Sequence, residues 1–124
     1  MSLSQLHRLI ATAFSIFALV VTLLAAYRLI RRQALSGDFW GAVVIGEGLV
    51  LLQAILGLIL LIGGRQPGRG IHFLYGALTV LVWPITYTYS QTQDEHRTAL
   101  VWTLASAFLF GLSIRAIGTG SPLP

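Results

Sequence analysis

The feature that most constrains this chain is a set of four long apolar stretches separated by short polar connections. The stretches cover residues 6–30, 39–62, 71–89 and 98–117. Each is close to the roughly 20 residues that a helix needs to cross the hydrocarbon core of a bilayer. A helix satisfies all of its backbone groups internally, as that environment requires. We therefore expect an all-α integral membrane protein with a single transmembrane domain over residues 1–124.

The composition agrees with a membrane protein and excludes several soluble classes. Hydrophobic residues make up 56% of the chain and charged residues only 10%, whereas soluble domains carry about 25% charged residues. There is no cysteine, which excludes a disulfide scaffold, thiolate metal sites and iron–sulfur clusters. All eight basic residues are arginines near the ends of the apolar stretches. This placement is typical of membrane flanks and argues against nucleic acid as a partner.

Turn and cap signals predict where the helices end. The connection over residues 63–70 is rich in glycine and proline and is the clearest break in the chain. Short connections force consecutive helices to alternate in direction, which predicts an up-and-down four-helix bundle. The last residues, 118–124, are expected to form a frayed tail. The expected helices cover about residues 5–31, 38–63, 70–90 and 95–117.

The orientation in the membrane depends on a weak charge signal, because each side carries four arginines. The dense cluster of Arg28, Arg31 and Arg32 favours a cytoplasmic first loop by the positive-inside rule. The expectation is thus a multi-pass protein of the cell inner (plasma) membrane with both termini outside. Aromatic residues near the first and third loops predict an interfacial belt on that face, formed by Tyr27, Phe39, Trp40, Tyr87, Tyr89 and Trp102.

Two histidines lie at the start of the first and third expected helices. These helices run parallel in an up-and-down bundle, so His7 and His72 are predicted to lie on one membrane face at similar depth. Two imidazoles that face each other across a bundle suit the axial positions of a haem iron. One turn further in, Ala11 and Gly76 are small and leave room for a macrocycle. The same spacing also allows both histidines to be ordinary interfacial residues.

Other polar residues near the membrane faces have simpler interpretations. Arg8, Arg69 and Arg115 belong to the same face as the histidine pair and could bind haem propionates there. Arg65 lies on that face as well. His96 lies in a charged loop on the opposite face, where a solvated side chain is the better interpretation.

Glu47 is the acidic residue that lies deep inside an apolar stretch. An ionisable group at that depth costs about 2.5 kcal/mol or more, so Glu47 should face the bundle interior and be paired or protonated. It is either a proton-relay or cofactor-contacting carboxyl, or a neutral acid hydrogen-bonded to Gln53, Tyr75 or Thr79. The same stretch contains glycines that suit close packing, namely Gly41, Gly46, Gly48 and Gly57.

Three short segments carry a likeness to a known family. The first expected helix opens with His7 and Arg8, and the third opens with His72 and Phe73 after a Gly/Pro loop. The second contains the run Gln53-Ala54-Ile55-Leu56-Gly57. Together, over about residues 4–117, they resemble one half of the haem A synthase family, whose members are membrane haem-modifying enzymes built from two four-helix halves.

The resemblance implies that His7 and His72 are the axial ligands of a haem, because paired histidines at equivalent helix starts ligate haem in that family. Family members carry a catalytic glutamate one turn before the first histidine, where this chain has Ser4. They also commonly carry a cysteine pair in a loop, which this chain lacks. The resemblance therefore implies a half-size relative that does not hydroxylate a haem methyl group on its own.

The sequence favours a membrane haem-binding protein that holds one haem b between its first and third helices, for electron transfer or haem handling. A different class stays open, a non-catalytic accessory or scaffold subunit of a larger respiratory or photosynthetic membrane complex. A third alternative is a small transporter that uses Glu47 as a proton site. The expected partners are membrane lipid and either further copies of the chain, as a homo-oligomer, or the subunits of such a complex.

Overall fold

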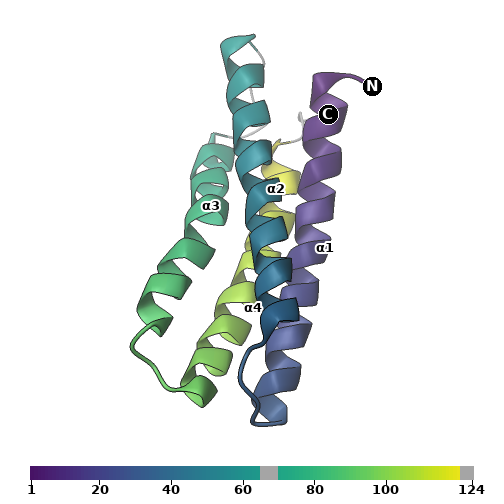
Figure 1. The fold of residues 1–124 in the computed structure, drawn as a ribbon. Coiled ribbons are helices and arrows are strands. Elements are labelled where there is room, and N and C mark those ends of the chain that lie inside the picture. Colours follow the sequence, from purple (N-terminus) through teal and green to yellow (C-terminus); the bar gives the residue numbers. More distant parts are fainter. Residues whose placement is uncertain (65–69, 121–124) are drawn as a thin grey trace.

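The computed structural model describes residues 1–64 and 70–120, and within these ranges it contains four α-helices (Figure 1). All four are long and apolar enough to cross a membrane, which fits a multi-pass membrane protein. The expected all-α four-helix bundle is confirmed. The helices are α1 (Leu3–Ile30), α2 (Gly37–Ile62), α3 (Ile71–Ser90) and α4 (Glu95–Gly120).

The first and last helices extend slightly beyond their expected ends, for local reasons. α1 begins at Leu3 because Ser2 and Gln5 form a capping box, in which each side chain accepts a hydrogen bond from the backbone N–H of the other. α4 continues to Gly120 instead of fraying after residue 117. Its last turn is held because Thr119 is only 3% exposed and contacts α3. Residues 121–124 lie outside the described residues.

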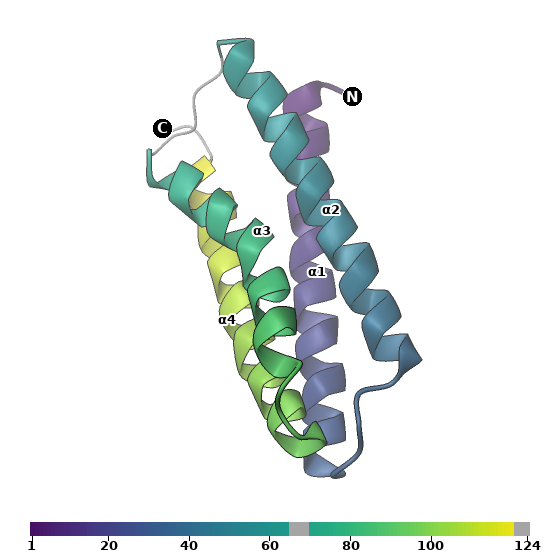
Figure 2. The same ribbon diagram turned by 60° about the vertical axis from the view of Figure 1, so that its left-hand side comes forward.

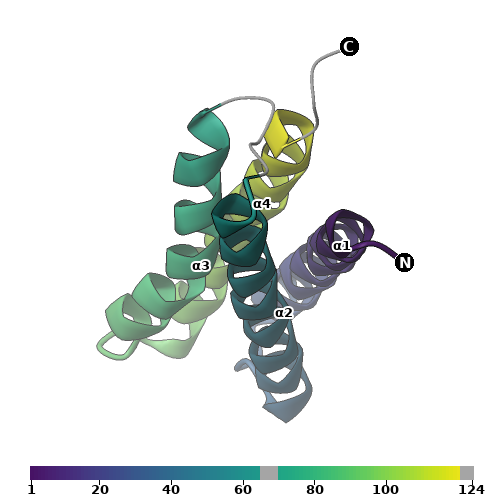
Figure 3. The ribbon, with the colours of Figure 1, turned by 90° about the horizontal axis from the view of Figure 1, so that it is seen from above.

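The helices form a ring in which each is antiparallel to its neighbours in sequence, and α4 closes the ring against α1 (Figure 3). α1 and α3 are thus parallel and diagonal to each other. Packing is most extensive between α1 and α4 and least extensive between α2 and α3. Figure 2 shows α3 lying along α4, while α2 lies along α1. The interior is wider at the end of the bundle that carries the N-terminus, because a cavity lies there, lined by residues of all four helices.

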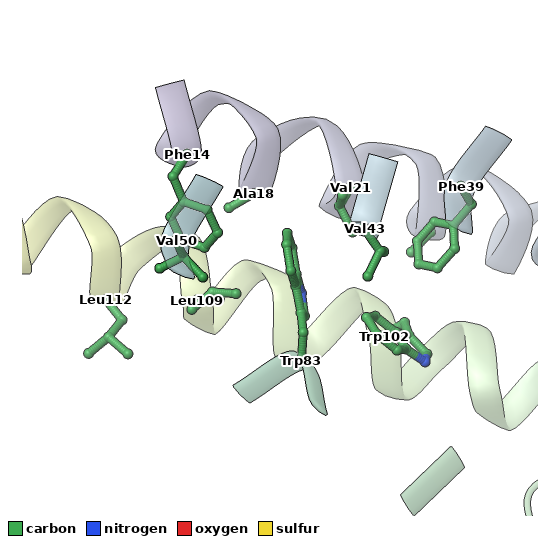
Figure 4. Packing of buried hydrophobic residues seen from close by; sticks show 11 residues of the cluster. Phe14, Ala18, Val21, Phe39, Val43, Val50, Trp83, Trp102, Leu109 and Leu112 are labelled. Carbon is green, nitrogen blue, oxygen red and sulfur yellow. The ribbon is translucent and has the colours of Figure 1, made fainter. Parts of the chain in front are cut away.

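Bulky side chains fill the rest of the interior (Figure 4). Trp83 and Trp102 are buried, and their indole N–H groups donate to Ser106 Oγ at 3.0 Å and Ser90 Oγ at 3.2 Å. Trp83 packs against the backbone of α2, where a Cβ on Gly46 would lie 2.6 Å from the indole ring. Because the indole N–H groups have hydrogen-bond partners, this part of the core is tightly packed and leaves no buried indole donor unpaired.

The aromatic residues near the first and third connections do not all form an interfacial belt. Tyr27, Tyr87 and Tyr89 are exposed, as a belt requires. Phe39 and Trp102 instead point into the bundle, where they are 1% and 0% exposed and their ring centroids lie 5.5 Å apart. The expectation was wrong for these two because the helix periodicity places them on the inner stripe of α2 and α4.

Candidate functional site

His7 and His72 meet inside the wide end of the bundle. Their ring centroids are 6.3 Å apart and the ring planes are inclined by 69°. The two residues come from diagonal helices, α1 and α3, which are not in direct contact along their backbones. The side chains therefore span the interior of the bundle from opposite sides. This is the juxtaposition that the parallel course of the two helices predicts.

His72 is held in a defined orientation by the last turn of α4. Its Nδ1–H donates to the carbonyl oxygen of Ala116 at 2.7 Å, and Nδ1 lies 3.3 Å from Thr119 Oγ1. Gly120 allows this approach, since a Cβ there would lie 2.7 Å from His72 Cε1. A proton on Nδ1 leaves the lone pair of the ring on Nε2. A histidine whose Nδ1–H binds a backbone carbonyl is the usual arrangement of a metal ligand.

His7 is positioned mainly by α2. Its Nε2 lies 3.3 Å from Nε2 of Gln53, and its ring packs on Gly57, where a Cβ would lie 3.0 Å from Cε1. Among the described residues, His7 Nδ1 and Gln53 Oε1 are buried and have no hydrogen-bond partner. Buried polar atoms without a partner are rare in folded proteins, and a bound water or ion is one way in which they are satisfied.

A cavity of about 460 Å³ surrounds the histidine pair. This volume lies within the range of about 300 to 1,000 Å³ that is typical of small-molecule and cofactor sites. Ala11 and Gly76, the small residues one turn below the histidines, both line it, as do Gln53 and Gly57. Its walls are otherwise mostly apolar, so the cavity suits a ligand with a large apolar body.

The arginines predicted for this site take different places. Arg8 lines the cavity and its side chain is exposed, so its guanidinium is accessible to an anionic group of a ligand. Arg115 is exposed and does not line the cavity. Arg65 and Arg69 lie outside the described residues. Of the predicted arginines that the structure describes, only Arg8 is thus in place at the cavity.

Glu47 is not part of the cavity wall. Its side chain is half-buried in α2, and Oε2 is buried without a hydrogen-bond partner among the described residues. Two of the three expected partners are engaged elsewhere, because Thr79 donates to the carbonyl oxygen of Gly76 and Gln53 contacts His7. Gln53 is six residues further along, which places it on a different side of α2. His96, which was expected in the third connection, lies in the first turn of α4 and is exposed as expected.

The contribution of the C-terminal end of α4 to this site was not predicted from the sequence, because residues 118–120 were expected to fray. The spacing of small residues along α4 could have indicated it. Ser106, Ser113 and Gly120 recur every seven residues, which places them on one side of a helix. Ser106 and Ser113 are buried, and the same stripe carries Gly120 to the ring of His72. Extending this pattern would have placed residues 119–120 on the inner face.

Metal ligation at this site would depend on the histidine pair. Across residues 1–64 and 70–120, no three His, Cys, Asp or Glu side chains group closely enough to hold a metal ion by themselves. Two imidazoles alone do not complete a usual coordination shell. The remaining ligands would have to come from a group that brings its own, as a porphyrin does with its four ring nitrogens.

Comparison with protein-family models, curated proteins and solved structures found no match for this chain.

Proposed function

We propose that this chain is a membrane haem-binding protein in which His7 and His72 are the axial ligands of one b-type haem held between α1 and α3. The observation that carries the proposal is the separation of the two rings across the cavity, 6.3 Å between centroids. Two metal–nitrogen bonds of about 2 Å, with about 1 Å from each nitrogen to its ring centre, require about 6 Å. The interior already has the spacing that a shared metal needs.

The residues around the pair support this ligand. Ala11 and Gly76 leave space beside the histidines, and the cavity is large and mainly apolar, as the body of a porphyrin requires. Arg8 is the exposed cation at the cavity, where it can bind a propionate. Ala116 and Thr119 hold His72 so that its Nε2 carries the lone pair. The donor set and the shape of the cavity thus fit the same group.

Electron transfer or haem handling is the activity that this arrangement favours. When bound, the haem supplies a one-electron redox couple. Ligation on both faces leaves no position on the iron for oxygen or a substrate. The cavity wall contains no Asp or Glu among the described residues, and Ser4 occupies the place of the catalytic glutamate of the haem A synthase family. Both points argue against hydroxylation of a haem methyl group by this chain.

The test is an absorption spectrum of the detergent-purified protein, produced with ample haem supply. A reduced-minus-oxidised spectrum of the b type, with a haemochrome assay near one haem per chain, is the expected result. His7→Ala and His72→Ala should each abolish this signal, because each removes one axial bond. His96→Ala is the matched control, since His96 is exposed in the first turn of α4 and does not line the cavity, and it should leave the signal unchanged.

Two results would overturn the proposal. A well-folded wild-type protein without pigment would show that His7 and His72 are interfacial residues, and an accessory subunit of a larger complex would then be the better interpretation. Histidine variants that keep the wild-type spectrum and haem content would show that the haem is held elsewhere.

A further inference from the structure

The cavity around the histidines reaches the outside of the bundle between two particular helices. Apart from Arg8, the cavity-lining residues with exposed side chains are Ala54 and Leu58 of α2, and Phe73 and Ala77 of α3. Leu58 is 57% exposed and Phe73 is 48% exposed. A side chain that lines a cavity and is also exposed marks its mouth. Within the described residues, the mouth therefore lies between α2 and α3.

The packing of the bundle explains why the mouth is there. α2 and α3 form the least extensive contact of the four neighbouring pairs. They are in close contact lower in the bundle, where Trp83 of α3 packs on Gly46 of α2. Above that point the facing positions carry the small side chains of Ala54 and Ala77, which do not fill the gap.

The depth of the mouth shows what it opens to. Ala54 lies eight residues before the end of α2 at Ile62, and Ala77 lies six residues after the start of α3 at Ile71. At 1.5 Å per residue, these positions are about 12 Å and about 9 Å from the helix ends. Both lie inside the apolar stretches that span the hydrocarbon core. The mouth thus faces lipid acyl chains.

We propose that the gap between α2 and α3 is a lateral portal through which the site takes up its ligand from the bilayer. The portal is apolar, and Arg8 is the exposed cation of the cavity wall. This combination suits a flat, lipid-soluble molecule that carries carboxylates at one edge. A porphyrin has that form, and the identification of the ligand as haem rests on the function proposed above. The portal itself is inferred from the exposed cavity-lining side chains of α2 and α3 and does not depend on the identity of the ligand.

A labelling experiment tests the portal without haem. The chain contains no cysteine, so Ala11→Cys places a single thiol in the cavity wall on α1. In liposomes, a lipid-soluble maleimide should label this thiol faster than a membrane-impermeant charged one. Adding Ala77→Phe, which narrows the mouth, should slow labelling by the lipid-soluble reagent several-fold. Adding Ala107→Phe is the matched control, because Ala107 is exposed on α4 and does not line the cavity; the rate should stay unchanged.

The portal would be refuted by equal labelling with both reagents, or by a labelling rate that Ala77→Phe leaves unchanged. A second measurement connects the portal to haem. Ala77→Phe should slow the uptake of haem from haem-loaded vesicles several-fold, while Ala107→Phe should leave the rate at the wild-type value. Uptake at the wild-type rate would show that haem enters by another route. A wild-type protein that takes up no haem would overturn the proposed function, and the labelling result would still decide the portal.

Discussion

At the scale of single residues, the contact between Gln53 and His7 controls whether His7 can act as a ligand. As placed, Gln53 Nε2–H donates to His7 Nε2 at 3.3 Å, while Gln53 Oε1 and His7 Nδ1 have no hydrogen-bond partner within residues 1–64 and 70–120. In this arrangement the His7 ring carries its proton on Nδ1, and the lone pair on Nε2 accepts from Gln53. Neither ring nitrogen is then available to bind a metal. A half turn of the carboxamide exchanges its oxygen and nitrogen. The oxygen then accepts from Nε2–H, and the lone pair moves to Nδ1.

Replacement of Gln53 by Leu should therefore weaken haem binding at the proposed site without unfolding the bundle. Loss of an outer hydrogen bond to a metal-binding histidine costs about 10- to 100-fold in affinity, and we expect a loss of that order. The midpoint potential should also rise, since His7 becomes a poorer electron donor. Haem titration and redox titration measure the two effects. Gln91→Leu is the control, because the Gln91 side chain is exposed and, among the described residues, donates only to the carbonyl oxygen of Tyr87; an equal shift in both variants would contradict this role.

At the scale of helices, one close contact sets the distance between α2 and α3. Gly46 lies where a Cβ would be 2.6 Å from the indole of Trp83. That indole is 1% exposed and its N–H is bound to Ser106 on α4, so it cannot easily move aside. The glycine thus allows α2 to approach α3 below the portal. A Cβ on Gly48, two residues further along, would meet no neighbouring atom within 4 Å.

Paired glycine substitutions test this contact. Gly46→Ala should destabilise the bundle by about 1–3 kcal/mol, which is typical of overpacking a rigid core. Gly48→Ala makes the same chemical change in open space and should be neutral or stabilising by up to about 1 kcal/mol, because alanine favours a helix. Thermal unfolding in detergent, followed by circular dichroism, compares the two. Equal stabilities for both variants would show that the approach of α2 to Trp83 carries no energetic weight.

At the scale of the whole molecule, the two ends of the bundle differ in packing. The end with the first and third connections holds an edge-to-face cluster of Phe39, Trp40 and Trp102. The other end encloses a cavity of about 460 Å³ with unpartnered polar atoms. Filling that cavity with a bound group would add contacts and satisfy His7, so the stability of the whole bundle should depend on its ligand.

Haem should raise the unfolding temperature of the wild-type protein in detergent. A ligand present at 100 times its dissociation constant adds about 2.7 kcal/mol to the free energy of unfolding. Thermal scans of the haem-free protein with and without added haem measure this effect. The His7→Ala, His72→Ala double variant should show no such increase. An equal increase in that variant would mean that haem stabilises the bundle without binding to the histidine pair.

The order and type of the helices followed from hydropathy, because the cost of exposing backbone groups in a bilayer leaves helices as the solution for long apolar stretches. The meeting of His7 and His72 also followed, since alternating helices put the first and third in parallel. The hydrogen bond of His72 to Ala116 could not be predicted from hydropathy or helix order, because it joins residues 44 positions apart. It depends on the last turn of α4, whose composition alone suggests fraying.

What the sequence by itself determined is a chain of four membrane-length helices with two histidines at one end. Local composition and periodicity suffice for that, because each helix satisfies its own backbone. Only the tertiary structure decided that Gln53 contacts His7, that Gly120 lies against His72, and that α2 and α3 part to leave a mouth toward lipid. These features depend on how far neighbouring helices approach each other. That distance is set by side chains on both partners at once, Gly46 and Trp83 among them.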